Sequence, residues 1–180
     1  CNFGSMSLHV AQDMRDIRQT CTVISDSDVV FSGEASLERA VRSALELFQP
    51  SVLFVVSGCV SEMIGDDIPA VLARIPHEAP LLHVEAAGFR GDAARGLEAG
   101  WLALLPLMKP PVPRPYPRPY PRSDPRPLVN LIGLGMDDPH AADDVEALRA
   151  MLAPQAALGA VLSRCTLEEV RRAPYADVNL

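Results

Sequence analysis

The spacing of hydrophobic residues changes along the chain between a helical period and the unbroken apolar runs of buried strands. From Leu37 to Phe48, apolar residues recur at every third or fourth position. This spacing predicts an amphipathic helix that starts near Glu34 and stops before Pro50. Residues 52–56 are apolar at every position, the pattern of a parallel strand buried on both faces. Helix and strand thus follow each other closely here.

The same alternation continues toward the middle of the chain. A helix is predicted over about residues 67–74, with Asp66 as its N-cap, and a strand over 81–85. A loop at 88–91 then leads into a long helix over 92–107 with acid at its start. This order of elements is typical of a parallel α/β sheet.

The beginning of the chain gives weaker patterns. A helix is predicted over about residues 6–18, and residues 21–24 are a candidate for a short strand. Residues 25–28 supply Ser and Asp side chains that favour a turn. These elements would precede the amphipathic helix.

A second series of alternating elements is predicted near the end of the chain. Strands are expected over 128–134, 160–162 and 178–180, and helices over 143–152 and 166–172. The two series together predict the α/β class, with doubly wound, Rossmann-like parallel sheets.

A proline-rich segment separates the two series. Residues 109–127 repeat Pro-Arg-Pro-Tyr, which suits neither a helix nor a sheet ladder, so an extended polyproline conformation is expected. We interpret the segment as a surface linker, with a proline-motif ligand or a basic contact patch as the alternative. The domain prediction is a first α/β subdomain over 1–108, the linker over 109–127 and an incomplete second subdomain over 128–180.

The composition indicates a globular chain and argues against two classes of partner. Of the 180 residues, 48% are hydrophobic, enough for a buried core. The net charge of −7 argues against a nucleic-acid-binding surface. No apolar run approaches the roughly 20 residues of an integral membrane segment. Because the chain begins on Cys1 and stops within a predicted strand, we expect a fragment of a longer protein.

Cysteines are the residues best suited to carry chemistry. Cys1, Cys21, Cys59 and Cys165 are widely spaced, without the CxxC pair of zinc knuckles and thioredoxin-like motifs. Cys21 and Cys165 are expected to be small buried hydrophobic residues. Cys59 differs, because it lies between a predicted buried strand and a predicted helix. A thiolate is stabilised at such a position and can bind a soft metal or attack an electrophile.

Other chemistries have weaker support. Gly133-Leu-Gly135 follows a strand as a dinucleotide-binding loop does, but Asp138 occupies the third glycine position. No GxSxG nucleophile elbow occurs. The pair Asp66-Asp67 could bind a metal but is explained more simply by a helix start. A cysteine hydrolase would pair Cys59 with a histidine, and the spacing selects none of His9, His77, His83 and His140.

Several segments, taken in chain order, match the motifs of one family. Ser57-Gly-Cys-Val-Ser-Glu-Met-Ile-Gly-Asp-Asp67 resembles T-C-x-x-x-x-I-G-D-D, the most specific match. Asp28-Val-Val-Phe-Ser-Gly-Glu34 resembles D-x-V-F-G-G, and Ala87-Gly-Phe-Arg-Gly91 resembles G-F-x-G. Residues 129–133 and 166–179 resemble segments of the second subdomain. The family is nitrogenase component 1, with its molybdenum–iron protein subunits, cofactor-assembly scaffold and dark-operative protochlorophyllide reductase.

The resemblance implies a fold of three α/β subdomains, of which this chain would hold most of the first and the beginning of the second. It implies a hetero-oligomer with a homologous partner subunit and a bridging iron–sulfur cluster (4Fe-4S or P-cluster-like). By the matching motif, Cys59 would ligate the cluster, and Gly58 would allow its close approach. Cys1 maps to an earlier ligand by order and distance. A cytoplasmic location is also implied.

Two functions follow from the resemblance. In the first, the chain belongs to an oxidoreductase subunit whose cluster relays electrons from an ATP-dependent iron protein to a reduction site. In the second, it belongs to a scaffold on which a nitrogenase-type metallocluster matures, without a turnover substrate of its own. A generic α/β binding domain with inert cysteines is the third reading. The substrate, the cluster type and the activity of the isolated chain stay open.

Overall fold

The computed structural model describes residues 18–108, 124–134, 140–162 and 165–180. The chain divides into two compact units, Cys1–Leu105 and Pro106–Leu180, which are described separately. Cys1 and nearly all of the predicted helix over 6–18 lie outside the described residues, as does most of the predicted linker. Within the described parts, no helix combines the length and the apolar character that a bilayer crossing needs.

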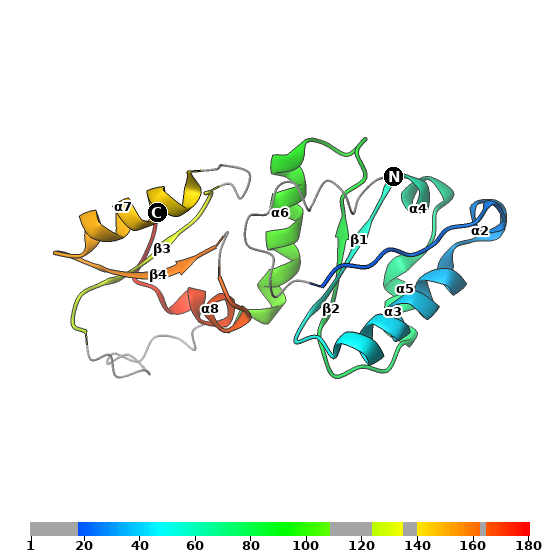
Figure 1. The fold of residues 1–180 in the computed structure, drawn as a ribbon, viewed down its shortest axis with the longest axis horizontal. Helices are drawn as coiled ribbons and strands as arrows, with labels where there is room; N and C mark the ends of the chain where they lie inside the picture. Colours follow the sequence, from blue (N-terminus) through cyan, green and yellow to red (C-terminus); the bar gives the residue numbers. More distant parts are fainter. Residues whose placement is uncertain (1–17, 109–123, 135–139, 163–164) are drawn as a thin grey trace. The chain divides into compact units, whose positions relative to one another are not determined.

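The first unit is a two-stranded parallel sheet between helices (Figure 1). Leu53 of β1 lies opposite Leu81 of β2, and the register continues to Ser57 and Glu85. The elements follow the order α2 (Asp26–Phe31), α3 (Glu34–Phe48), β1 (Leu53–Ser57), α4 (Cys59–Ile64), α5 (Ile68–Arg74), β2 (Leu81–Glu85) and α6 (Ala93–Leu104). The 3₁₀ turn η1 (Leu105–Leu107) contains the boundary between the two units.

The core of this unit lies between the sheet and the pair α3 and α5. The residues buried there are Val41, Ile68, Val71, Leu72 and Ile75. On the other face of the sheet, α6 packs along β2 (Figure 1). Phe54 and Val56 of β1 stay 38% and 45% exposed on that face, so the prediction of a strand buried on both faces is wrong for the described residues.

Two further predictions for the first unit are wrong. Residues 21–24 form no strand, and the expected turn at 25–28 is the start of α2. The Ser25 side chain caps α2 and the Asp28 carboxylate accepts from the Ser25 backbone, a capping box that stabilises the helix start. A short apolar run and a short capped helix look alike in sequence.

Asp66 does not cap α5 as predicted; its neighbour Asp67 does, accepting from the Ala70 amide at 3.0 Å. The Asp66 carboxylate instead accepts from the Gly33 amide at 3.0 Å and from the Ser32 hydroxyl at 2.9 Å. It thus fastens the start of α3, where a Cβ on Gly33 would lie only 2.7 Å from Asp66 Oδ2. The two aspartates stabilise helix starts, as expected, but Asp66 does so for α3 and Asp67 for α5.

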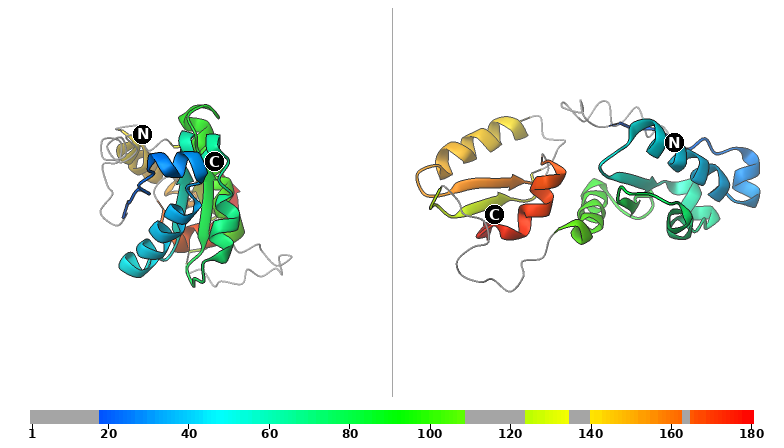
Figure 2. Two further views of the ribbon diagram at one scale, coloured as in Figure 1. Left: turned by 90° about the vertical axis from the view of Figure 1, so that its right-hand side faces the viewer. Right: turned by 90° about the horizontal axis from the view of Figure 1, so that it is seen from below.

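The second unit is a three-stranded parallel sheet with helices on opposite faces (Figure 1, Figure 2). Its strand order is β4-β3-β5. The elements are β3 (Leu128–Leu131), α7 (Ala141–Leu152), β4 (Ala157–Val161), α8 (Leu167–Arg172), the 3₁₀ turn η2 (Ala173–Tyr175) and β5 (Val178–Asn179). Parallel sheets flanked by helices in both units confirm the predicted α/β fold class.

Asn130, at 2% exposure, connects the middle of this second sheet. The pairing of β3 with β4 is irregular between Val129 and Leu131, and there the side-chain oxygen Oδ1 of Asn130 accepts from the Ala160 amide at 3.0 Å. The side-chain nitrogen Nδ2 of Asn130 donates to the Ala173 carbonyl at 2.9 Å and to Asn179 Oδ1 at 3.0 Å. One neutral side chain therefore satisfies polar groups on both sides of β3.

Candidate functional site

Cys59 lies where β1 gives way to α4, at the carboxyl edge of the first sheet. Gly58 is the N-cap of α4 in an extended conformation, and its carbonyl accepts from the Ser61 hydroxyl at 3.1 Å. A Cβ on Gly58 would meet nothing within 4 Å, so open space surrounds this backbone. The thiol is half-buried, which leaves one side of the sulfur free to meet a ligand.

The Cys59 sulfur accepts a hydrogen bond from the Gly88 amide at 3.2 Å. Gly88 follows β2, and because the carboxyl ends of parallel strands meet at one edge, the loop after β2 reaches the residue after β1. A Cβ on Gly88 would lie 3.7 Å from the sulfur, an ordinary contact. Residue 88 therefore contributes its backbone amide as the donor. The contact with the Cys59 sulfur does not require that this residue be a glycine.

A buried carboxylate lies one turn after Cys59. The Glu62 side chain is 6% exposed and accepts from Ser57 Oγ at 2.6 Å and from the Ala87 amide at 3.2 Å. Its second oxygen is paired with the Arg90 guanidinium. Burial raises the pKa of Glu62, but the hydrogen bonds from Arg90, Ser57 and Ala87 outweigh it and hold the pKa below its ordinary value.

His83 extends this hydrogen-bonded group from β2. Its Nε2 lies 3.2 Å from Ser57 Oγ, and since that hydroxyl donates to Glu62, it accepts from the imidazole. Burial lowers the pKa of His83 below its usual value, and the charges of Glu85 and Glu62 only partly oppose this. Neutral imidazole is the favoured form in this setting.

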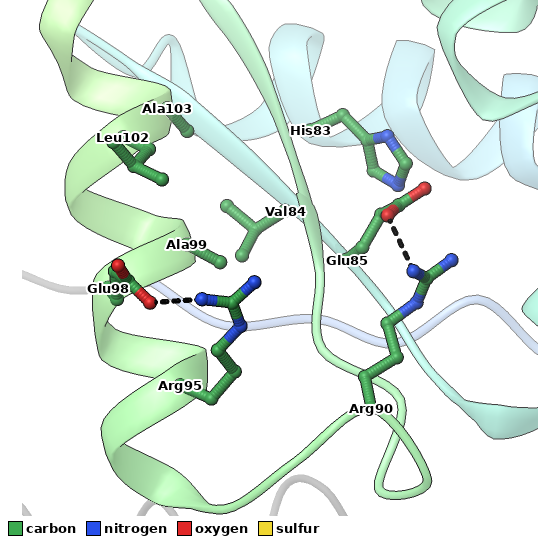
Figure 3. Close-up of a pocket in the computed structure, with 9 residues that line it drawn as sticks. All are labelled: His83, Val84, Glu85, Arg90, Arg95, Glu98, Ala99, Leu102 and Ala103. Atoms are coloured by element: carbon green, nitrogen blue, oxygen red, sulfur yellow. Dashed lines mark hydrogen bonds and ion pairs between the residues drawn. The ribbon is translucent and has the colours of Figure 1, made fainter.

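An open hollow of about 470 Å³ lies beside this group, between β2 and α6 (Figure 3). Val84, Ala99 and Leu102 give it an apolar floor. Its rim carries two ion pairs, Arg95 with Glu98 at 2.5 Å and Arg90 with Glu85 at 3.1 Å (Figure 3). The opposite charges on the rim balance, so the hollow has no preference for an anion or a cation.

The described histidines, His77, His83 and His140, do not pair with Cys59 as a cysteine hydrolase would require. The His83 ring bonds to Ser57, and the His77 ring lies against the Ala79 carbonyl. His140 begins α7 in the second unit, and His9 lies outside the described residues. No described histidine is thus seen to act as a base for this thiol.

Cys59 is the sulfur that the matching motif offers to a metal–sulfur cluster among the described residues. Across the ranges that the structure describes, no group of three or more His, Cys, Asp or Glu side chains could hold a metal ion together. Cys21 is exposed before α2, so the expectation that it is buried is wrong, and Cys165 is half-buried in the second unit. A soft thiolate with a backbone donor suits iron, but Cys59 can be only one of several ligands. Cys1 lies outside the described residues.

Sequence reasoning located Cys59 but missed the group around Glu62. Glu62 stands three positions after Cys59 on α4, a helix that the sequence pattern does not predict, since it indicates a helix only from about residue 67. Had a helix been recognised here, the spacing of three would have placed both residues on one face. Arg90 and Ala87 could not be connected with it from spacing, because they lie 28 and 25 positions away along the chain.

Comparison with known proteins places these features in a family context. A family model described as nitrogenase component 1 type oxidoreductase matches residues 3–180. A nitrogenase iron-molybdenum cofactor biosynthesis protein NifE from Methanosarcina barkeri is 31% identical over 172 residues, 88% of this chain and 35% of that protein. The protein of the same name from Rippkaea orientalis is 40% identical over 86 residues, 47% of this chain and 18% of that protein.

A solved structure, "Nitrogenase Cp1 at pH 5", has a similar fold. It superposes with a TM-score of 0.66 at 25% identity over 88% of this chain and 30% of that one. The chain spans about a third of the length of this structure and of the Methanosarcina barkeri relative.

Proposed function

The chain belongs to the nitrogenase component 1 type oxidoreductase family, and we propose that its protein uses Cys59 to hold an iron–sulfur cluster during the assembly of a nitrogenase-type cofactor. The observation that carries the proposal is the Cys59 sulfur, half-buried at the sheet edge with the Gly88 amide donating to it. A thiolate is the ligand that iron–sulfur clusters use, and backbone donors to sulfur accompany such ligation. Gly58 leaves the approach to Cys59 open.

The assembly role is supported by the relatives. Two proteins named for iron-molybdenum cofactor biosynthesis match this chain at 31% and 40% identity, one of them over 88% of it. In this role the cluster is a cargo that matures and leaves, and the chain needs no turnover substrate. Cys59 would hold the cluster, and the other ligands would come from Cys1 and from a partner chain.

A partner subunit is part of the proposal, because the surface around Cys59 is apolar. Val60 and Met63 of α4 are 39% and 77% exposed, and Phe89 beside Gly88 is 60% exposed. Phe31 of α2, which packs against α4, is 85% exposed. A homologous subunit that covers these side chains would remove apolar surface from water and supply further ligands to the same cluster.

Iron and sulfide analysis of the full-length protein, purified anaerobically, tests the cluster. Wild type is expected to hold iron and sulfide, and Cys59→Ala to lose most of both. Cys165→Ala is the matched control, since it removes another half-buried thiol far along the chain and should retain the iron. A wild-type protein without iron, or a Cys59→Ala protein with an unchanged cluster, would contradict the proposal.

Electron relay is the second candidate function, favoured by a match to a nitrogenase molybdenum-iron protein alpha chain from Methanosarcina barkeri, 32% identical over 73 residues. The cluster would then pass electrons from an ATP-dependent iron protein to a reduction site. Incubation of the loaded protein with cofactor-free nitrogenase separates the two. Transfer of the cluster supports assembly, whereas ATP-dependent reduction of a retained cluster supports relay.

A further inference from the structure

The turn after β2 is held at both ends by one carboxylate. The Arg90 amide donates to the Ala87 carbonyl at 2.8 Å, which closes a turn of four residues with Gly88 inside it. Glu62 Oε1 accepts from the Ala87 amide at 3.2 Å, and Glu62 Oε2 is paired with the Arg90 side chain. Gly88, whose amide donates to the Cys59 sulfur, therefore lies between Ala87 and Arg90, the two residues that Glu62 holds in place.

Glu62 is itself fixed by its surroundings. Its side chain is 6% exposed, and the Ser57 hydroxyl, 3% exposed at the end of β1, donates to it at 2.6 Å. The position of Oε1 is thus set by two donors from two different strand ends. A carboxylate is needed because both oxygens accept, which the amide group of glutamine cannot do.

We propose that Glu62 is a positioning residue that keeps the Gly88 amide on the Cys59 sulfur and thereby sets the reduction potential of the iron–sulfur cluster bound there. The inference rests on the proposed function, since it assigns a role toward the same cluster. An amide donor to a ligating sulfur stabilises the more negative, reduced cluster. Loss of that donor makes the cluster harder to reduce, so the potential becomes more negative.

The matched control is Glu85. It pairs with the same Arg90 guanidinium at 3.1 Å, but its side chain is 52% exposed and it accepts from no backbone amide of the turn in the described structure. Glu85→Gln therefore perturbs Arg90 without releasing Ala87. Glu62→Gln keeps the shape of the side chain and one of its two acceptor oxygens. Glu62→Ala removes both acceptor oxygens.

The first measurement is hydrogen exchange of residues 86–91 in the full-length protein. We expect exchange at Gly88 and Ala87 to become about tenfold faster or more in Glu62→Ala, since a hydrogen bond is lost, and to change less in Glu62→Gln. Glu85→Gln should exchange as the wild type does. Unchanged protection in Glu62→Ala overturns the positioning role.

The second measurement is the reduction potential of the cluster in the anaerobically purified protein. A shift to more negative potential in Glu62→Gln and Glu62→Ala, at unchanged iron content, supports the inference. A wild-type potential in variants whose turn exchanges faster overturns it. A wild type that contains no iron overturns the proposed function and the claim on potential, while the exchange data still decide whether Glu62 holds the turn. Should Glu62→Ala fail to fold, Glu62→Gln carries both measurements.

Discussion

Asn130 in the second unit and Glu62 in the first are buried polar side chains that each bond to three other groups, but they occupy different places in their sheets. Asn130 lies in the central strand of the second unit and bonds to Ala160, Ala173 and Asn179. Glu62 lies beyond the end of β1 in the first unit and bonds to Ser57, Ala87 and Arg90.

The difference concerns what each side chain holds in place. Asn130 is neutral and satisfies buried groups inside the sheet, so its role is to hold the strands together. Glu62 carries a charge and fixes a loop whose amide points at a half-exposed sulfur. Burial of a charge is costly unless it is paired, and such a charge at a sheet edge next to a reactive group indicates function more than stability.

The largest expected effect is a loss of stability of the second unit when Asn130 is replaced. Asn130→Ala leaves the Ala160 amide buried without its acceptor and takes one of two donors from the Ala173 carbonyl, which still accepts from the Ala176 amide. We expect a loss of about 3 kcal/mol of unfolding free energy. Urea unfolding measures it. Asn179→Ala, at an exposed position bonded to the same amide, is the control and should lose much less. Equal losses in the two variants would contradict the assignment of Asn130 as the structural centre.

Two glycines next to these side chains sharpen the comparison. A Cβ on Gly159 would lie 2.7 Å from Asn130 Oδ1 and 3.3 Å from the Val129 carbonyl oxygen. We expect Gly159→Ala to cost about 2 kcal/mol, because the packed sheet cannot move aside. Gly88→Ala meets only the Cys59 sulfur at 3.7 Å and should stay within about 0.5 kcal/mol of wild type. Thermal unfolding of both variants measures these losses. A larger loss in Gly88→Ala than in Gly159→Ala would contradict the packing described.

The cysteines of the two units are expected to differ in reactivity. Burial, with a smaller contribution from Glu169, raises the pKa of Cys165 to about 11, so its thiol stays protonated at neutral pH. We expect Cys165 to react with iodoacetamide at least about tenfold more slowly than the exposed Cys21 near pH 8. Mass spectrometry of the metal-free protein measures both rates.

Glu169→Gln is the control for this experiment, because glutamine keeps the capping box of α8. It should raise the rate at Cys165 only slightly, since burial is the larger cause. A Cys165 that reacts as fast as Cys21 would contradict the burial of its thiol.

The smallest expected effect is the acid sensitivity that Glu62 gives to the first unit. The pKa of Glu62 is lowered from 4.5, so its stabilisation is complete above that pH and is lost as the pH falls through the lower folded value. As the pH falls below 4.5, wild type should therefore lose more unfolding free energy than Glu62→Gln. Urea midpoints at each pH test this. Identical slopes of the urea midpoint against pH in the two proteins would contradict this prediction.

Most elements could be predicted from the sequence, including the short helix α8 that Thr166 caps, but the structure of residues 21–28 and the helix α4 could not. The helix at Glu34–Phe48 and the strands at Leu53–Ser57 and Leu81–Glu85 follow from apolar spacing alone, since many positions agree. Residues 21–24 gave too few positions to separate a strand from an exposed segment. The choice between Asp66 and Asp67 as N-cap shifts the helix start by one residue, and helix propensity does not locate a helix start that accurately.

The candidate site was predictable only where it follows the chain. Cys59 could be placed because a strand, a loop and a helix follow each other in sequence there. The bonds from Gly88 and Arg90 depend on the register of β1 with β2, which no local pattern contains. The exposed Phe54 and Val56 show the same limit, since an apolar run does not reveal which of its faces the neighbouring helix covers.

The contact between Asp66 and Gly33 has an evolutionary consequence. The two residues come from separate sequence motifs, yet a single added methyl group on Gly33 would collide with the Asp66 carboxylate at 2.7 Å. The Asp66 carboxylate is also the acceptor for the Gly33 amide. Mutations at one position are therefore tolerated mainly when the other has already changed, so across homologous genes the two codons should covary.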